Sequence, residues 1–206
     1  GNVYTTGHFS GTADFDPGAG TANLTSAGSI DIFITKFDSS GAYVWAKQVG
    51  GTSDERGQSI VVDSSSNTYI TGFFNGTVDF DPGAGTAELT SAGGSDMFIL
   101  KLDSAGDFSF VKQVGGTSAE LSYAIKLDSD GNIYTTGYFM GTTDFDPGAG
   151  TANLTSVGDG DIFVSKLDSS GIYVWAKGMG GVTDYDAGYS IDVDSSGNVY
   201  TTGYFV

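Results

Sequence analysis

The chain has 206 residues, with 8 Lys and Arg against 25 Asp and Glu, and its formal net charge is −17. This balance argues against nucleic-acid binding and membrane docking, because both need clustered cations. Hydrophobic residues make up 39% and cysteine is absent, so the chain can build a core but offers no disulfide, catalytic thiolate or thiolate zinc site.

Short β-prone runs bounded by turn residues occur throughout the chain. In the middle of the sequence they are SIVVD (59–63), NTYITGFF (67–74), DMFILKLD (96–103) and FSFVKQV (108–114), with turns such as DSAG (103–106) between them. No segment shows a sustained helical period with caps, and no apolar run approaches the roughly 20 residues of a membrane span. The sequence therefore predicts an all-β protein without membrane insertion.

The same pattern recurs at an interval of 65 residues, as shown by Asp16, Asp81 and Asp146, with one extra residue before the last recurrence. We expect repeats over 1–66, 67–130 and 131–196, and the start of a fourth over 197–206. Four short strands per unit predict tandem β-propeller-type blades, each a four-stranded antiparallel sheet. Residues 11–29 are predicted to form an extra hairpin between the second and third strands. Closed propellers need about 4–8 blades, so the ring is predicted to be incomplete within this chain.

The stretch DFDPGAGT stands at 14–21, 79–86 and 144–151, and contains all three prolines. Proline cannot sit in a central strand and glycine adopts positive φ easily, so the stretch predicts the tip of the extra hairpin. Phe15 and Leu24 are expected to face the body of the blade. Asp14 and Asp16, two apart on one strand, are expected to project together from the opposite face.

The chain resembles the bacterial SBBP repeat, described as a seven-bladed β-propeller repeat. The resemblance is carried by DIFITKFDSSGAYVWAKQVGG (31–51), by SIVVDSSSNTYITGFF (59–74) and by VDSSGNVYTTG (193–203), and it covers essentially the whole chain. It implies propeller blades on secreted or surface-displayed bacterial proteins, usually without a known activity. The middle repeat departs from the pattern at Phe110, where the other repeats have tryptophan, and at Ser66, where they have glycine.

The paired aspartates of the hairpins are the candidates for a metal, because Ca²⁺ takes six to eight oxygen ligands and an Asp-x-Asp pair beside a glycine-rich turn offers several. These are Asp14, Asp16, Asp79, Asp81, Asp144 and Asp146. The alternative is that they cap their own turns. The turns over 127–134 and 192–200 have similar spacing without the terminal Glu of a calcium loop, and strand-joining turns are the simpler interpretation. Asn23, Asn75 and Asn153 fit the N-glycosylation pattern.

No catalytic constellation is evident, so the chain is not expected to be an enzyme. The single histidine, His8, occupies an aromatic position of the repeat, and Trp45 and Trp175 fit packing between blades better than stacking on sugars. The recurring Lys36, Lys101 and Lys166 are expected to pair with a recurring aspartate. No cofactor other than calcium is suggested.

We expect a structural or adhesive repeat protein that is extracellular or displayed on the cell surface. Because the sequence has no start Met and no signal-peptide pattern, we expect it to be an excised or mature piece of a longer protein. Its predicted partners are copies of itself or further repeats of the same parent chain, joined through strand edges into a multimer or filament. The alternative is a module of a larger closed propeller that binds a glycan or a protein.

Overall fold

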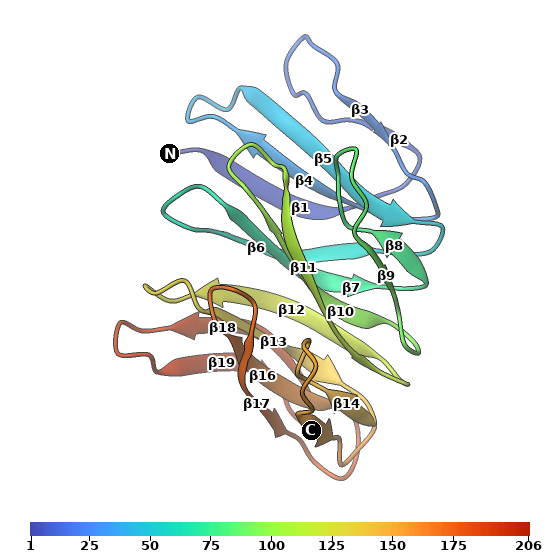
Figure 1. Cartoon of the computed structure of the whole chain (residues 1–206), viewed down its shortest axis with the longest axis vertical. Coiled ribbons are helices and arrows are strands. Elements are labelled where there is room, and N and C mark those ends of the chain that lie inside the picture. The colour runs from blue at the N-terminus through green and yellow to red at the C-terminus, as the bar shows by residue number, and fades with distance from the viewer.

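The computed structural model describes residues 1–206, which form nineteen strands and no helix (Figure 1). Two four-stranded antiparallel sheets form complete blades. Blade 2 contains β6 (Arg56–Val62), β7 (Thr68–Phe74), β10 (Asp96–Leu102) and β11 (Phe108–Gly116), and blade 3 contains β12 (Glu120–Leu127), β13 (Ile133–Phe139), β16 (Asp161–Leu167) and β17 (Tyr173–Met179). No helix is present that is long and apolar enough to cross a membrane.

Incomplete blades lie at the two ends of the array. Blade 1 contains β1 (Val3–Phe9), β4 (Asp31–Phe37) and β5 (Tyr43–Gly51), and so lacks a first strand. Blade 4 contains only β18 (Ala187–Val193) and β19 (Val199–Tyr204), which are first and second strands. The predicted class of an all-β array of antiparallel blades with an incomplete ring is confirmed. Each sheet starts one strand before the repeat bounds expected at 67 and 131.

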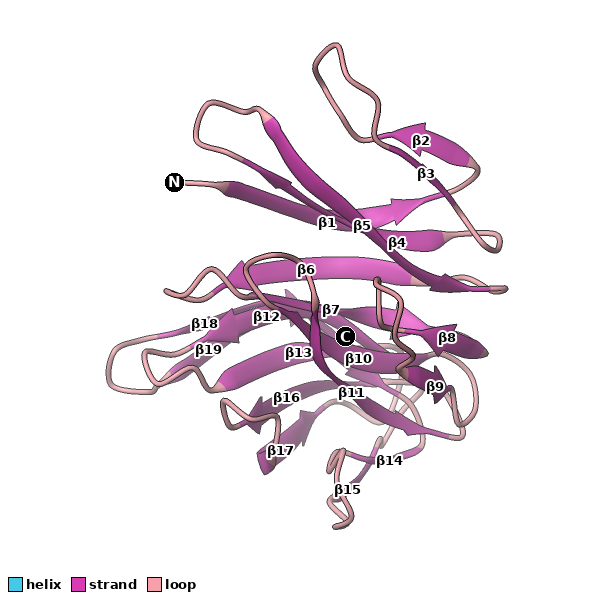
Figure 2. Cartoon of the chain, turned by 45° about the horizontal axis from the view of Figure 1, so that its top comes forward, coloured by secondary structure: helices cyan, strands magenta, loops and turns pink.

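A short hairpin follows the second strand of blades 1, 2 and 3: β2 (Thr12–Asp14) with β3 (Asn23–Thr25), β8 (Thr77–Asp79) with β9 (Glu88–Thr90), and β14 (Thr142–Asp144) with β15 (Asn153–Thr155). The predicted hairpins are confirmed, and those of blades 2 and 3 also have a pairing that the sequence did not indicate. β8 pairs with β5 and β14 pairs with β11, so a hairpin extends the sheet of the preceding blade. Figure 2 shows β8 and β9 beside β10 and β11 of their own blade. The hairpins thereby link consecutive blades.

Apolar side chains pack between the blades, and the third strand of each complete blade contributes to both of its faces. In β10, Phe98 and Leu100 belong to the core shared with blade 1, whereas Met97 and Ile99 belong to the core shared with blade 3. A strand covered on both faces has no solvent side, which is why DMFILKL reads as a nearly continuous apolar run instead of an alternating one.

Three phenylalanines of each blade join its hairpin to its sheet. In blade 3, Phe145 of the hairpin contacts Phe139 of β13 and Phe163 of β16 at ring-centroid distances of 5.3 and 5.2 Å. The matching contacts in blade 1 join Phe15 to Phe9 and Phe33. The expectation that Phe15 faces the body of the blade is therefore correct.

The turn between the first and second strands requires a left-handed residue. Gly131 and Gly197 have φ of 79° and 82° there, and Ser66 has φ of 66° in the same position. A residue with a Cβ is strained in this region, so the serine is a costly variant of the turn.

Candidate functional site

The hairpin tips use their paired aspartates to hold backbone amides. Asp14 Oδ1 accepts hydrogen bonds from the N–H groups of Asp16 (3.0 Å) and Ala22 (2.8 Å), and Asp16 Oδ1 accepts one from Gly18 (2.7 Å). These backbone N–H bonds lower the pKa of Asp14. A Cβ on Gly20 would overlap Asp16 Oδ2, which explains a glycine at this position. The other two hairpins repeat the bonds, through Asp79 and Asp81 and through Asp144 and Asp146.

The expectation that Asp14 and Asp16 project together from one strand face is wrong. Strand β2 ends at Asp14, so Asp16 already lies in the turn and the two-residue alternation no longer applies. Both carboxylates point into the turn, which corresponds to the capping alternative. No group of three or more His, Cys, Asp or Glu side chains is arranged to hold a metal ion. Calcium binding by the six aspartates is not tested by these contacts, and the engagement of their Oδ1 atoms by backbone amides favours the capping alternative.

Two equivalent clefts of about 380 and 350 Å³ lie between the last strand of one blade and the hairpin of the next. The first cleft is lined by Lys47, Gln48, Asp79 and Asp81. In the second, Lys112, Gln113, Asp144 and Asp146 occupy the same places, with Asp96 added. Each cleft therefore repeats the same polar lining at a fixed period, with the Gln48 and Gln113 amides already donating to Asp31 and Asp96.

The expected glycosylation asparagines differ in their surroundings. Asn23 and Asn153 are the exposed first residues of β3 and β15. Asn75 Nδ2 donates to the Asp54 carbonyl at 3.0 Å, and its Oδ1 accepts from Ser95 Oγ at 2.9 Å. A glycan on Asn75 would replace an N–H of the amide that donates to Asp54 and would have to fit beside a half-buried side chain, so the exposed Asn23 and Asn153 are the accessible acceptors.

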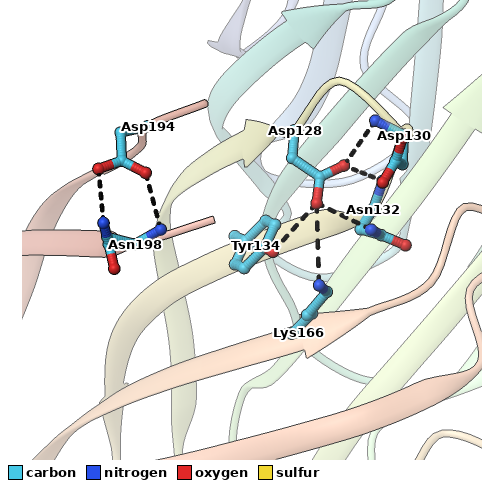
Figure 3. Close-up of polar contacts among 7 residues, drawn as sticks. All are labelled: Asp128, Asp130, Asn132, Tyr134, Lys166, Asp194 and Asn198. Carbon is cyan, nitrogen blue, oxygen red and sulfur yellow. Dashed lines mark hydrogen bonds and ion pairs between the residues drawn. The ribbon is translucent and has the colours of Figure 1, made fainter. Parts of the chain in front are cut away.

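Figure 3 shows the turn between the first two strands of blade 3, which has the spacing of a calcium loop. Asp128 Oδ1 accepts from the N–H groups of Asp130 (3.0 Å) and Asn132 (2.9 Å). Its Oδ2 accepts from Asn132 Nδ2 (2.8 Å) and Tyr134 Oη (3.0 Å), with Lys166 Nζ at 3.8 Å. The hydrogen bonds from Asn132, Tyr134 and Asp130 outweigh burial and lower the pKa of Asp128. The carboxylate is fully occupied within the protein, as a strand-joining turn requires.

The expected pairing of the recurring lysines with an aspartate is found in this turn. Lys166 pairs with Asp128 and also lies 4.9 Å from the centroid of the Tyr134 ring. Lys101 lies 4.9 Å from the Tyr69 ring and lowers the pKa of Asp63, although burial of that group acts in the opposite direction and is the largest single effect on it. Lys36 instead donates to the Ser104 carbonyl of the next blade at 2.9 Å. Of the three lysines, Lys166 forms the expected ion pair with an aspartate.

The two tryptophans act in packing, whereas His8 is exposed. Trp45 and Trp175 contact Tyr4 and Tyr134 edge to face at 6.2 Å and pack against the cores between blades. His8 is an exposed residue of β1 opposite Ile32.

Each junction between blades buries two carboxylates that the sequence analysis did not bring together. At the junction of blades 2 and 3 they belong to Asp96 and Glu120, both fully buried. Glu120 Oε2 accepts from the Gly116 N–H (2.8 Å) and Oε1 from Thr143 Oγ1 (2.7 Å), whereas Asp96 Oδ1 has no partner. Burial, with a smaller contribution from Asp96, raises the pKa of Glu120 to about 7.

The carboxylate pair recurs at the other two junctions, as Asp31 with Glu55 and as Asp161 with Asp186. Burial raises the pKa of Glu55 to about 7 as well. The recurrence of an acid at 55 and 120, spaced like the hairpin aspartates, was the signal available in the sequence. Nothing in the sequence indicates that the following blade covers it.

The last blade exposes side chains that the preceding blades bury. Tyr200 and Phe205 are 59% and 65% exposed, while the matching Tyr134 and Phe139 of blade 3 are 1% and 0% exposed. Tyr134 packs against Trp175 of the fourth strand, and Phe139 packs against Phe145 of the hairpin and lies in one core with Phe163 of the third strand, whereas blade 4 contains none of these elements. Blade 4 thus presents an apolar face, and β1 presents an unpaired edge, because blade 1 lacks the strand that pairs with β7 and β13 in blades 2 and 3.

The fold defines a β-propeller repeat array. A model of the family described as "Beta-propeller repeat" (SBBP) matches residues 44–72 and 110–138. Each match covers the last strand of one blade and the first two strands of the next, and leaves the hairpin out. Two segments of the chain therefore match the SBBP β-propeller repeat, in agreement with the resemblance of its motifs, while the bacterial origin stays a prediction.

Two curated proteins are similar to the chain. One is "Uncharacterized WD repeat-containing protein L264" of Acanthamoeba polyphaga mimivirus, 25% identical over 209 residues, which covers 91% of this chain and 15% of that protein. The other is "Regulatory protein FlaEY" of Caulobacter vibrioides, 25% identical over 110 residues, which covers 53% of this chain and 12% of that protein. The chain therefore spans only a small part of the length of either relative. Together, the matched repeats and the similarity to a protein named for its WD repeats support a β-propeller repeat module.

Proposed function

We propose that the chain is a β-propeller interaction module whose open blades are completed by blades of the same kind. The observation that carries the proposal is the exposure of Tyr200 and Phe205, whose counterparts in blade 3 are buried. The repeats themselves indicate the occupant, because the hairpin and the fourth strand of blade 3 supply Phe145 and Trp175, which pack against the counterparts of these residues. Further repeats of the parent chain or a second copy would both supply that cover.

In its sharper form, the proposal assigns the cover to a second copy through exchange of strands. Residues 197–205 repeat residues 1–9 except that Tyr204 replaces His8. The hairpin β18–β19 of one copy would therefore replace β1 on β4 of another, at little difference in pairing energy. Phe205 would take the place of Phe9 against Phe15 and Phe33, and β18 would add the first strand that blade 1 lacks. Strand addition to an open edge is a common mode of association.

The proposal includes a location at the cell surface and a structural or adhesive role there. A structural or adhesive role at the cell surface suits near-identical blades, because multivalent display needs a repeated surface. It also suits a chain with no cysteine and with a net charge of −17. We propose no catalytic activity, since the carboxylates and lysines of the repeats are engaged in turns and junctions.

Disulfide trapping tests the exchange of strands between copies. Because the chain has no cysteine of its own, only the introduced cysteines can form a disulfide. Thr5 lies opposite Thr35, with 2.6 Å between their hydroxyl oxygens, and Thr201 is the counterpart of Thr5. A mixture of Thr35→Cys and Thr201→Cys chains should form a covalent heterodimer under oxidation. The control Thr5→Cys/Thr35→Cys should close within one chain. If the control closes and the mixture remains monomeric, strand exchange is refuted.

A second candidate function is glycan binding, favoured by the two equivalent clefts beside the hairpins. A fixed period of polar clefts suits a polymer with repeating hydroxyl groups. A Lys47→Ala/Lys112→Ala variant should lose a signal that the wild-type chain gives on a glycan microarray. Absence of any wild-type signal would remove this candidate.

A further inference from the structure

Four tyrosine rings gather at the junction of blades 3 and 4. Tyr123 lies on β12, Tyr138 on β13, Tyr185 in the segment before β18, and Tyr189 on β18. Ring centroids of Tyr138 and Tyr185 are 4.5 Å apart, and those of Tyr123 and Tyr189 are 5.3 Å apart. The hydroxyl oxygens of Tyr123 and Tyr185 are 3.2 Å apart. These four residues are called the tyrosine cluster below.

The cluster departs from the repeat. At the junction of blades 2 and 3, the matching positions hold Gln58, Phe73, Ala119 and Tyr123. The fourth recurrence also contains the one extra residue of the chain, in the segment that places Tyr185. Asp184 in that segment has φ of 64°. An array of otherwise similar junctions has thus acquired three additional phenol rings at one of them.

A glycine makes room for the rings. Gly160 stands where the earlier repeats have Ile30 and Ser95. A Cβ on Gly160 would lie 3.3 Å from a ring carbon of Tyr138 and 3.3 Å from one of Tyr185, closer than ordinary contact. Glycine at 160 therefore occurs together with tyrosine at 138 and 185, as expected if the packing of these rings has a function.

The cluster is partly accessible and has an acidic rim. Tyr189 is 53% exposed, and a cleft of about 410 Å³ beside Tyr185 is lined by Asp159 and Asp184, with Tyr204 and Val206 on its other side. Both aspartates are exposed. Burial raises the pKa of Tyr185, so its phenol is neutral across the physiological range. Of the four rings, Tyr185 is the one that lines this cleft, and its neutral ring beside two carboxylates suits a flat cation.

We propose that the tyrosine cluster binds an arginine side chain of a basic protein segment. Guanidinium stacks on aromatic faces and forms forked bonds with carboxylates, which the rings and Asp159 or Asp184 would supply. The net charge of −17 favours a basic partner and speeds its approach. Tyr189 and Tyr204 lie on strands β18 and β19 of the open blade 4, so peptide binding is measured at concentrations where the chain is monomeric, which separates it from the completion of blades.

Fluorescence anisotropy at physiological salt with a labelled (Gly-Arg)₄ peptide tests the proposal. Tyr185→Leu and Asp184→Asn should each weaken binding about tenfold, a typical loss for one cation–π or charge-assisted contact. Asn accepts the left-handed backbone of position 184, so the fold should persist. The matched control is Asp130→Asn, which removes the same charge from an exposed turn and should change the affinity less than twofold. A peptide with citrulline in place of arginine should not bind.

Three outcomes would overturn the proposal. Equal losses in Asp184→Asn and Asp130→Asn would mean diffuse attraction to an acidic surface. Unchanged binding by Tyr185→Leu, with an unchanged melting temperature, would exclude the rings. Equal binding of the citrulline peptide would show that the rings serve a neutral partner. If Tyr185→Leu unfolds, Tyr185→Phe should retain affinity while Asp184→Asn loses it, and the reverse order would refute the proposal.

Discussion

The buried glutamates of the blade junctions should make the protein less stable as the pH rises from about 5 to about 8. Glu55 and Glu120 have pKa values of about 7 in the folded chain against an ordinary value of 4.5. The folded state therefore holds these protons more tightly than the unfolded state does. Their contribution to the free energy of unfolding is complete below pH 4.5, is lost as the pH rises to about 7, and stays lost above it.

The size of the effect follows from the two pKa values. The difference corresponds to about 3 kcal/mol for each glutamate over the whole range. The free energy of unfolding of small proteins falls by about 1–3 kcal/mol for each molar increase in urea. Losing half of the energy of one glutamate therefore lowers the unfolding midpoint by roughly 1 M. Aspartates such as Asp128, whose pKa is lowered, act only at lower pH and in the opposite direction.

Urea unfolding at pH 5.5 and pH 8, followed by circular dichroism, measures the difference. The midpoint should be higher at pH 5.5. The isosteric Glu55→Gln/Glu120→Gln variant should have nearly equal midpoints, and a His8→Tyr background removes the single imidazole from the comparison. A wild-type midpoint that does not change, or a glutamine variant that keeps the full dependence, would refute the assignment of the effect to the junction carboxylates.

Three further predictions follow from the repeats. Ser66→Gly should raise the free energy of unfolding by about 0.5–1 kcal/mol, because glycine relieves the strain at φ of 66°, and Gly131→Ser should lower the melting temperature in thermal scans. Phe139→Ala should cost about 3–5 kcal/mol, while the matched Phe205→Ala should cost less than about 0.5 kcal/mol at concentrations where the chain is monomeric; equal losses would contradict the assignment of blade 4 as open. Replacing EDTA by millimolar calcium should leave the melting temperature unchanged, because backbone amides already bind the hairpin aspartates, and an increase would instead establish the calcium site.

The architecture was predictable because every repeat carries the same local signals. Short apolar runs, Asp-Ser turns and the Pro-Gly tip determine strands and turns locally, and a period of 65 residues then implies blades. The inward position of Phe15 also followed from local alternation. Asp16 was misplaced because a strand end cannot be located to one residue from propensity, and its side chain bonds to the turn it enters.

The features that lie between blades were not predictable from local pattern. Glu120 looks like a surface acid until blade 3 is packed on blade 2, and its burial depends on the following hairpin through Thr143. The pairing of β8 with β5 joins a hairpin to the preceding blade, and no local signal specifies that partner. The tyrosine cluster similarly combines residues of three segments, and its only trace in the sequence is departure from the repeat.

Electron microscopy of the purified 206-residue chain, with the blades counted in each particle, tests the central claim most directly. The account predicts rings or filaments of several chains in which every blade has four strands and Phe205 is covered. A uniform population of single chains at high concentration, with blades 1 and 4 still open, would contradict it.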